Sequence, residues 1–135
     1  MERVKFEWSV RVYFEDTDSG GVVYHANYLK FMERARTEWL RTLGRDQIKL
    51  KQEDKLMFVV RKIDIQYKIP ARFNDELIIE TDCVKSTDYS IMLKQNILRD
   101  NQTITEGNVE IVCINSDLFK PVRIPKKAKQ LMEII

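Results

Sequence analysis

Apolar residues follow two different periods along the chain, and each period predicts a different kind of element. Residues 8–14 alternate between apolar and polar positions, which predicts a strand. Between residues 27 and 43 the apolar positions recur three or four apart, which is the period of a helix. Asn27 can cap the start of this helix, and Gly44 can end it in a left-handed conformation. The expected apolar faces comprise Trp8, Val10, Val12 and Phe14 on the strand, and Tyr28, Phe31, Met32, Ala35, Trp39 and Leu43 on the helix.

From residue 56 onward the alternating period returns and predicts four more strands. We expect the first from Leu56 to about residue 69, and the others at 76–85, 89–98 and 103–115. The turns between these strands are short, so neighbouring strands should be antiparallel. In the first of them, one face should hold Val59, Ile63, Ile65, Tyr67 and Ile69, opposite a polar face with Lys62, Asp64, Gln66 and Lys68.

The two remaining segments are shorter. Residues 46–54 predict a weak helix or a loop, and residues 125–135 predict a short helix. The inward residues of that last helix are expected to be Ala128, Leu131, Met132 and Ile135.

Together these elements predict a single α+β domain over residues 1–135. The helix at 27–43 is too apolar to lie on a surface, so an antiparallel sheet of about five strands should wrap around it. The other face and the edges of such a sheet stay open. Open edges can pair with a second subunit.

Composition narrows the class of protein. Hydrophobic residues make up 44% and charged residues 33% of the 135 residues, which is an ordinary globular mixture. The net charge of +2 is too small to predict a nucleic-acid partner. Two cysteines without a CxxC motif argue against a disulfide framework and a zinc site. No signal-peptide core and no apolar run of about 18 residues occurs, so we expect a cytoplasmic protein without a membrane span.

The loop at residues 15–25 is the candidate for chemistry. It holds an acidic cluster that ends in a glycine pair, and then His25, the only histidine of the chain, directly before the predicted helix. A helix N-terminus offers free N–H groups and a positive dipole end, which stabilise negative charge on a carbonyl oxygen. A carboxylate beside it could attack that carbonyl or activate a water molecule. The glycine pair lets the backbone approach a ligand closely.

This stretch resembles a known enzyme family. Residues 13–40 read YFEDTDSGGVVYHANYLKFMERARTEWL, which is similar to the motif of hotdog-fold acyl-CoA thioesterases in the 4-hydroxybenzoyl-CoA thioesterase-like superfamily. The similarity points to the bacterial Tol–Pal-associated, YbgC-type branch. It extends to residues 58–62, 67–72 and 120–125, and so covers nearly the whole chain. The resemblance implies a hotdog fold and hydrolysis of an acyl-CoA to a free acid and CoA, with no metal or redox cofactor.

The resemblance also implies roles for individual residues. Asp18 would be the catalytic carboxylate, acting either as general base toward water or as nucleophile that forms a mixed anhydride. The backbone N–H of His25 would polarise the thioester carbonyl, and its ring would orient substrate or water. Asp16 is expected to support the loop. The residues expected to bind substrate are Gly21, Val22, Tyr24, Tyr28, Arg61 and Arg72.

Partners and rival functions follow from the same resemblance. Members of the family pair sheet edge to sheet edge, so we expect a homodimer or homotetramer with its active sites at the interface. Two rival functions share this fold: a non-catalytic module that binds acyl-CoA or acyl carrier protein, and a dehydratase of 3-hydroxyacyl thioesters. Asp18 and His25 argue against the first rival, because binding a thioester needs neither. The second would want a histidine–carboxylate pair on a longer helix.

Several points stay open at this stage. The CoA phosphates could dock on Arg61, Lys62, Arg72 or the basic stretch at 120–129, and that stretch could also meet an anionic membrane surface. Asp16, Asp18 and His25 form too small a set of ligands to predict a metal site. The sequence sets neither the acyl chain length nor the carrier, CoA or acyl carrier protein.

Overall fold

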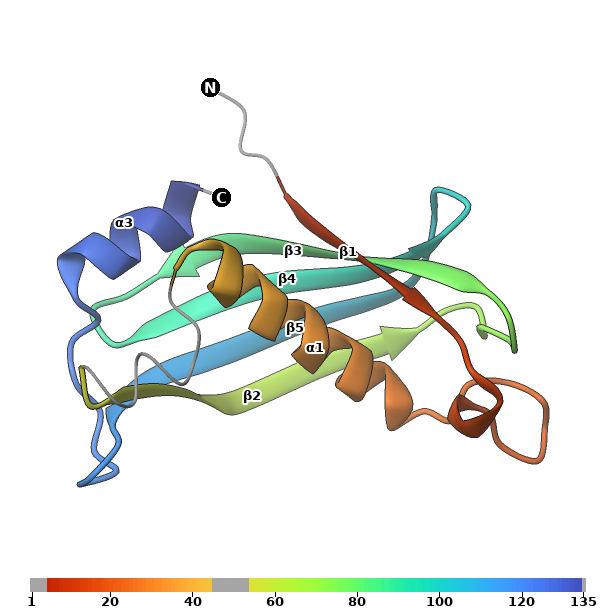
Figure 1. Ribbon diagram of the computed structural model, residues 1–135, viewed down its shortest axis with the longest axis horizontal. Coiled ribbons are helices and arrows are strands. Elements are labelled where there is room, and N and C mark those ends of the chain that lie inside the picture. Colours follow the sequence, from red (N-terminus) through yellow and green to blue (C-terminus); the bar gives the residue numbers. More distant parts are fainter. Residues whose placement is uncertain (1–4, 45–53, 135) are drawn as a thin grey trace.

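The computed structural model describes residues 5–44 and 54–134, and Figure 1 shows their arrangement. In these residues the strands form one five-stranded antiparallel sheet in the order β1-β3-β4-β5-β2. Helix α1 (Asn27–Thr42) lies across one face of the sheet, and α3 (Lys126–Ile134) packs against β3. The predicted sheet around one long helix is confirmed. The strands are β1 (Phe6–Arg11), β2 (Leu56–Tyr67), β3 (Glu76–Ser86), β4 (Ser90–Arg99) and β5 (Gln102–Asn115).

The core lies between α1 and the sheet face that the helix covers. Met32, Ala35 and Trp39 are fully buried there, as the helical period predicted. Burial of a large apolar side chain contributes roughly 1.5–3 kcal/mol, so this face holds the helix on the sheet. Gly107 on β5 marks a close approach, because a Cβ at this position would lie 2.5 Å from Cε of Met32 and 3.0 Å from the backbone oxygen of Gln95.

The first strand is shorter than predicted. Trp8 and Val10 pack on the core as expected, and Val12 is fully buried, but β1 ends at Arg11. Residues Phe14–Asp16 form a 3-10 turn instead, and Phe14 is 77% exposed. The backbone N–H of Tyr13 donates to the Asp16 carboxylate at 2.8 Å, and that bond favours a turn over continued alternation.

The second strand contains a bulge that the alternating period could not reveal. Its register against β5 shifts between Val60 and Lys62, so Arg61 is an extra residue. Val59 pairs with Val112, whereas Ile63 pairs with Val109 in the core. The prediction that Val59 and Ile63 share a face is therefore wrong, because one inserted residue moves the side chains before it to the other face.

The other predicted limits agree with the structure to within one or two residues. The turn between β4 and β5 is formed by Asp100 and Asn101, both with positive φ. In α3, Ala128 and Met132 are buried as expected, and Leu131 is half-buried. The predictions for residues 46–53 and for Ile135 lie outside the described residues. No helix within 5–44 and 54–134 is both long and apolar enough to cross a bilayer.

Candidate active site

The site loop, residues 17–25, is folded back on itself by backbone hydrogen bonds. The N–H of Asp18 donates to the carbonyl of Val22 at 2.9 Å, and the N–H of Gly21 donates to the carbonyl of Asp18 at 3.0 Å. Gly21 has a φ of +78°, which glycine adopts without strain. The loop therefore presents Asp18 at a tight turn rather than on a strand.

The Asp18 carboxylate is exposed and only partly engaged. Its Oδ1 accepts the N–H of Gly20 at 2.8 Å, which closes an Asx turn and fixes the side chain. Among the described residues, none donates to Oδ2. One oxygen thus orients the group while the other faces solvent, as a base or nucleophile requires.

Asp16 lies two residues earlier and has a different environment. It is 8% exposed, and both carboxylate oxygens are occupied. Oδ2 accepts the N–H of Tyr13 at 2.8 Å, and Oδ1 accepts the side-chain amide of Asn27 at 2.9 Å. Asp16 therefore ties the start of the site loop to the start of α1. Asn27 does not cap the helix as predicted, because its side chain points to Asp16 and Ala26 occupies the cap position.

The end of the site loop runs directly into α1. The N–H of Asn27 donates to the carbonyl of Tyr24 at 2.8 Å, which forms a turn around His25 and Ala26. His25 is exposed, and its own backbone N–H donates to no acceptor within residues 5–44 and 54–134. A free N–H at the positive end of a helix can stabilise a developing oxyanion.

An aromatic wall stands beside His25. The Tyr24 and His25 ring centroids are 4.5 Å apart, and the Tyr67 hydroxyl donates to the backbone oxygen of His25 at 2.9 Å. Tyr67 packs edge-on against Tyr28 at 5.2 Å. Tyr67 thus lies on the face of β2 that α1 covers, as predicted, but at the end of the strand it remains 46% exposed, whereas Tyr28 behind it is 3% exposed.

Buried and half-buried hydroxyls in this wall stay neutral at physiological pH. Burial raises the pKa of Tyr28, and the charges of Asp75 and Asp18 add to the shift, while the Ala71 N–H and Arg99 lower it. Burial also raises the pKa of Tyr67, with a further contribution from Tyr28. Both phenols are thus hydrogen-bonding groups rather than bases.

The turn between β2 and β3 forms the other support of the loop. Val22 forms an isolated bridge with Arg72, and the N–H of Val23 donates to the carbonyl of Ala71 at 2.8 Å. The turn is itself fixed by Asp75, whose carboxylate accepts the N–H of Arg72 at 2.8 Å and the guanidinium of Arg99 at 2.7 Å. The expected substrate residues Val22 and Arg72 therefore lie together.

Arg61 lies elsewhere. It sits in the middle of β2, and its guanidinium binds the Glu110 carboxylate through two hydrogen bonds of 2.9 and 2.8 Å. That pairing raises the pKa of Arg61 and lowers the pKa of Glu110. The structure thus brings Asp18, Gly21, Val22, Tyr24, His25, Tyr28 and Arg72 to one end of the sheet, and it does not bring Arg61 there.

Comparison with known proteins identifies the family of the chain that carries this loop. The family model described as the thioesterase-like superfamily matches residues 12–132. The chain belongs to that superfamily. It is 44% identical over 124 residues to the acyl-CoA thioesterase YbgC of Haemophilus influenzae, covering 92% of this chain and 91% of that one. It is 34% identical over 134 residues to the acyl-CoA thioesterase YbgC of Helicobacter pylori, covering 93% and 98%.

A solved structure has the same fold. The probable thioesterase of Bartonella henselae matches with a TM-score of 0.86 and 37% identity, over 90% of this chain and all of that one. The hotdog fold implied by the sequence resemblance is confirmed. Sequence reasoning does not assign to the candidate site three residues that support it, namely Tyr67, Asp75 and Arg99. The only signal for any of them is the turn at 67–72, which belongs to the family resemblance without a role for Tyr67.

Proposed function

We propose that this chain hydrolyses acyl-CoA thioesters, with Asp18 as the catalytic carboxylate. One observation carries the proposal: an exposed carboxylate, fixed through one oxygen by Gly20, shares a short loop with the backbone N–H of His25 at the start of α1, which donates to no acceptor in the described part of the chain. The names of the relatives from H. influenzae and H. pylori support acyl-CoA as the substrate.

Two routes use the same atoms. As a general base, Asp18 takes a proton from water while the water oxygen attacks the thioester carbonyl carbon. As a nucleophile, its own oxygen attacks that carbon, and water then hydrolyses the mixed anhydride. In both routes the carbonyl oxygen gains negative charge, which the His25 N–H stabilises, and the C–S bond breaks so that CoA leaves as a thiolate and takes up a proton.

The neighbouring residues are proposed to hold the substrate. Gly21 and Val22 offer backbone that a pantetheine chain can approach, and the Tyr24 ring offers an apolar surface beside His25. Arg72 is exposed and lies next to Val22, so its guanidinium is the proposed contact for a CoA phosphate. Arg61 is not assigned this role, because Glu110 already holds it.

The protein is proposed to act as a homo-oligomer of at least two copies. Strand β2 forms one edge of the sheet and has 12 residues, and no other strand of residues 5–44 and 54–134 pairs with its outer side, which can therefore offer a long row of backbone groups for pairing. A second copy can pair with this edge and extend the sheet. Figure 1 shows β2 as the outermost strand on the side opposite β1.

Thiol release from a series of acyl-CoA and acyl-carrier-protein thioesters tests the activity. The native protein should release thiol, and Asp18→Asn should lower the rate by roughly 10²–10⁴, because positioned proton transfer contributes about that factor. Asn keeps Oδ1, so the Asx turn with Gly20 and the fold should survive. Near-native hydrolysis by Asp18→Asn would refute the mechanism. Tight binding of acyl-CoA without any thiol release by the native protein would favour the binding-module alternative.

A further inference from the structure

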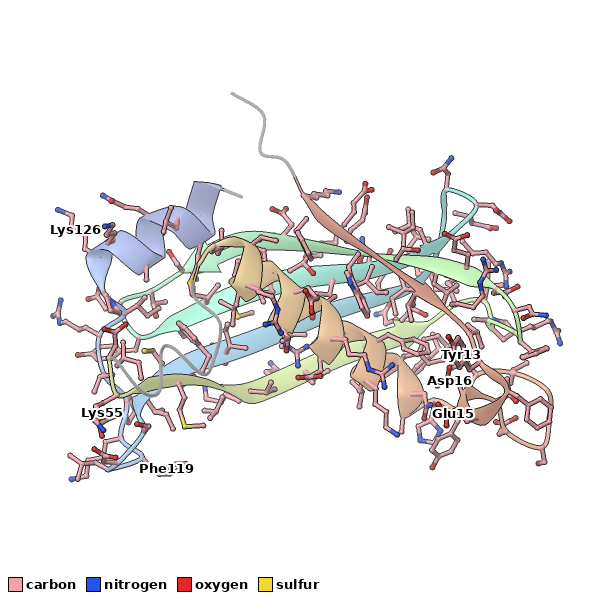
Figure 2. The ribbon with its side chains drawn as sticks, viewed as in Figure 1. Tyr13, Glu15, Asp16, Lys55, Phe119 and Lys126 are labelled. Carbon is pink, nitrogen blue, oxygen red and sulfur yellow. The ribbon has the colours of Figure 1, made fainter. Side chains whose placement is uncertain are left out.

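Two exposed apolar patches lie at opposite ends of strand β2. At the site end, Tyr24 and Tyr67 are each 46% exposed beside His25. At the other end, the turn at residues 116–120 exposes Leu118 by 69% and Phe119 by 67%. Figure 2 labels Phe119 and Lys55 at one end of the molecule and Tyr13, Glu15 and Asp16 at the opposite end.

The turn at 116–120 is held in place by several hydrogen bonds. Oδ1 of Asn115 accepts the N–H groups of Asp117 and Leu118 at 2.9 Å, and the carbonyl of Asn115 accepts the N–H of Phe119 at 2.8 Å. Phe119 has a φ of +54°, a left-handed conformation that is unfavourable for a bulky residue. A fixed turn that holds two large apolar side chains in water is typical of a surface that another molecule covers.

The turn is also tied to the start of β2. The N–H of Ser116 donates to the carbonyl of Lys55 at 2.9 Å, and Leu56 pairs with Asn115. At the other end of the strand, the Tyr67 hydroxyl bonds to His25. Since 12 extended residues span about 40 Å, Phe119 cannot reach the site loop of its own chain.

A two-fold axis that runs beside the middle of β2, between two paired copies of the strand, removes this separation. When two copies pair β2 to β2 in antiparallel fashion, the start of one strand lies beside the end of the other. The turn at 116–120 of one copy then meets Tyr67, Tyr24 and His25 of the other. Strand β1, the other edge, has only 6 residues and offers half the pairing length.

We propose that each active site is completed by Leu118 and Phe119 of the partner subunit, which form an apolar wall over the site loop for the acyl chain. The inference rests on the proposed function, because it assigns these side chains to the thioester site. Burying the two side chains against the aromatic residues of the site end stabilises the dimer and excludes water from the reacting carbonyl. Leu118 and Phe119 would thus help to set which acyl chain fits.

Mixed dimers of two defective variants test whether the site is shared. Asp18→Asn removes the carboxylate, and Phe119→Asp places a charge in the apolar wall. In a mixed dimer, one site receives both defects, and the other combines a native Asp18 with a native Phe119. When equal amounts of the two variants exchange subunits at random, half of the dimers are mixed and each mixed dimer carries one intact site. The mixture should therefore reach about one quarter of the native rate. If Phe119 acts in its own chain, mixing restores nothing and the proposal is overturned.

Val84→Asp is the matched control. Val84 is 48% exposed on β3, so a charge there should leave activity unchanged, and mixing it with Asp18→Asn should only dilute native sites.

Phe119→Ala is the second variant, needed if Phe119→Asp prevents dimer formation. It should keep the dimer and change the preferred acyl chain length. An unchanged preference in a stable Phe119→Ala dimer would contradict the proposed wall.

Cross-linking tests the geometry without any activity. Cys83 and Cys113 are buried, so a short bis-maleimide reagent should react only with introduced cysteines. A mixture of Phe119→Cys and Tyr67→Cys chains should form a covalent dimer, and neither variant should do so alone, because equal positions lie at opposite ends of the paired strands. Light scattering should give more than the 16.1 kDa of one chain. Cross-linking of Phe119→Cys with itself, or none in the mixture, overturns the pairing. Successful cross-linking of the variants together with no thiol release by the native protein would refute only the proposed activity.

Discussion

Asp16→Asn should destabilise the fold, even though it keeps the size of the side chain. In the native protein, Oδ2 accepts from the N–H of Tyr13 and Oδ1 accepts from the amide of Asn27, in a position that is 8% exposed. Asparagine has an NH₂ group in place of one of these oxygens. In one of the two contacts, two hydrogen-bond donors would therefore face each other. A buried donor that loses its partner costs about 1–3 kcal/mol, and the loss of a charged acceptor moves this toward the upper part of the range.

The expected decrease in the free energy of unfolding is therefore roughly 2–3 kcal/mol. For a domain of 135 residues this corresponds to a Tm lower by roughly 7–11 °C. Thermal unfolding followed by circular dichroism measures it. Asp18→Asn is the control, because it keeps the oxygen that accepts from Gly20 and should change Tm by less than about 2 °C. The two variants should thus separate loop stability from catalysis, and a native Tm for Asp16→Asn would refute the reasoning.

Two further predictions concern the site itself. His25→Ala should leave Tm unchanged and lower turnover, because alanine keeps the backbone N–H but lacks the ring that is expected to orient substrate or water. If steady-state assays show native turnover, only the backbone N–H of His25 has a role. Arg72→Gln should raise KM for acyl-CoA roughly three- to tenfold with kcat unchanged, because it removes one exposed charged contact with a phosphate. An equal rise in KM for a thioester substrate that lacks the nucleotide would contradict that contact.

The sequence predicts elements well where a period runs without interruption. The helix period placed Met32, Ala35 and Trp39 inward, and all three are fully buried. It fails where one residue shifts the pattern: the bulge at Arg61 moves Val59 to the other face, and alternation carries no mark of where an extra residue stands. Phe14 is a similar case, because a hydrogen bond from Tyr13 to Asp16 ends the strand while the alternation continues.

The candidate site was predictable mainly in its contiguous part, and Arg72 is the one expected residue from farther along the chain that the structure brings to it. Asp18, Gly21, Val22, Tyr24 and His25 lie within eight residues, and a family resemblance can mark such a run. The supports of the loop come from far along the chain. Tyr67 reaches His25 across 42 positions, and Arg99 reaches Asp75 across 24. These contacts depend on how the strands register, and no local pattern in the sequence encodes them.

The exposure of the site loop connects the chemistry with the second copy. Asp18 and His25 are both exposed in a single chain. A hydrogen bond to a developing oxyanion is worth much less in contact with water than in a site from which water is excluded, because the effective dielectric constant is higher. A single chain should therefore bind a thioester carbonyl at the helix start without stabilising its transition state fully. The turn that exposes Leu118 and Phe119 lies at the end of the edge strand β2 that is far from the site loop, and in a second copy its apolar side chains could exclude water from the site. The hydrolytic rate and the dimer should thus be lost together on dilution, whereas helix α1 and the sheet persist.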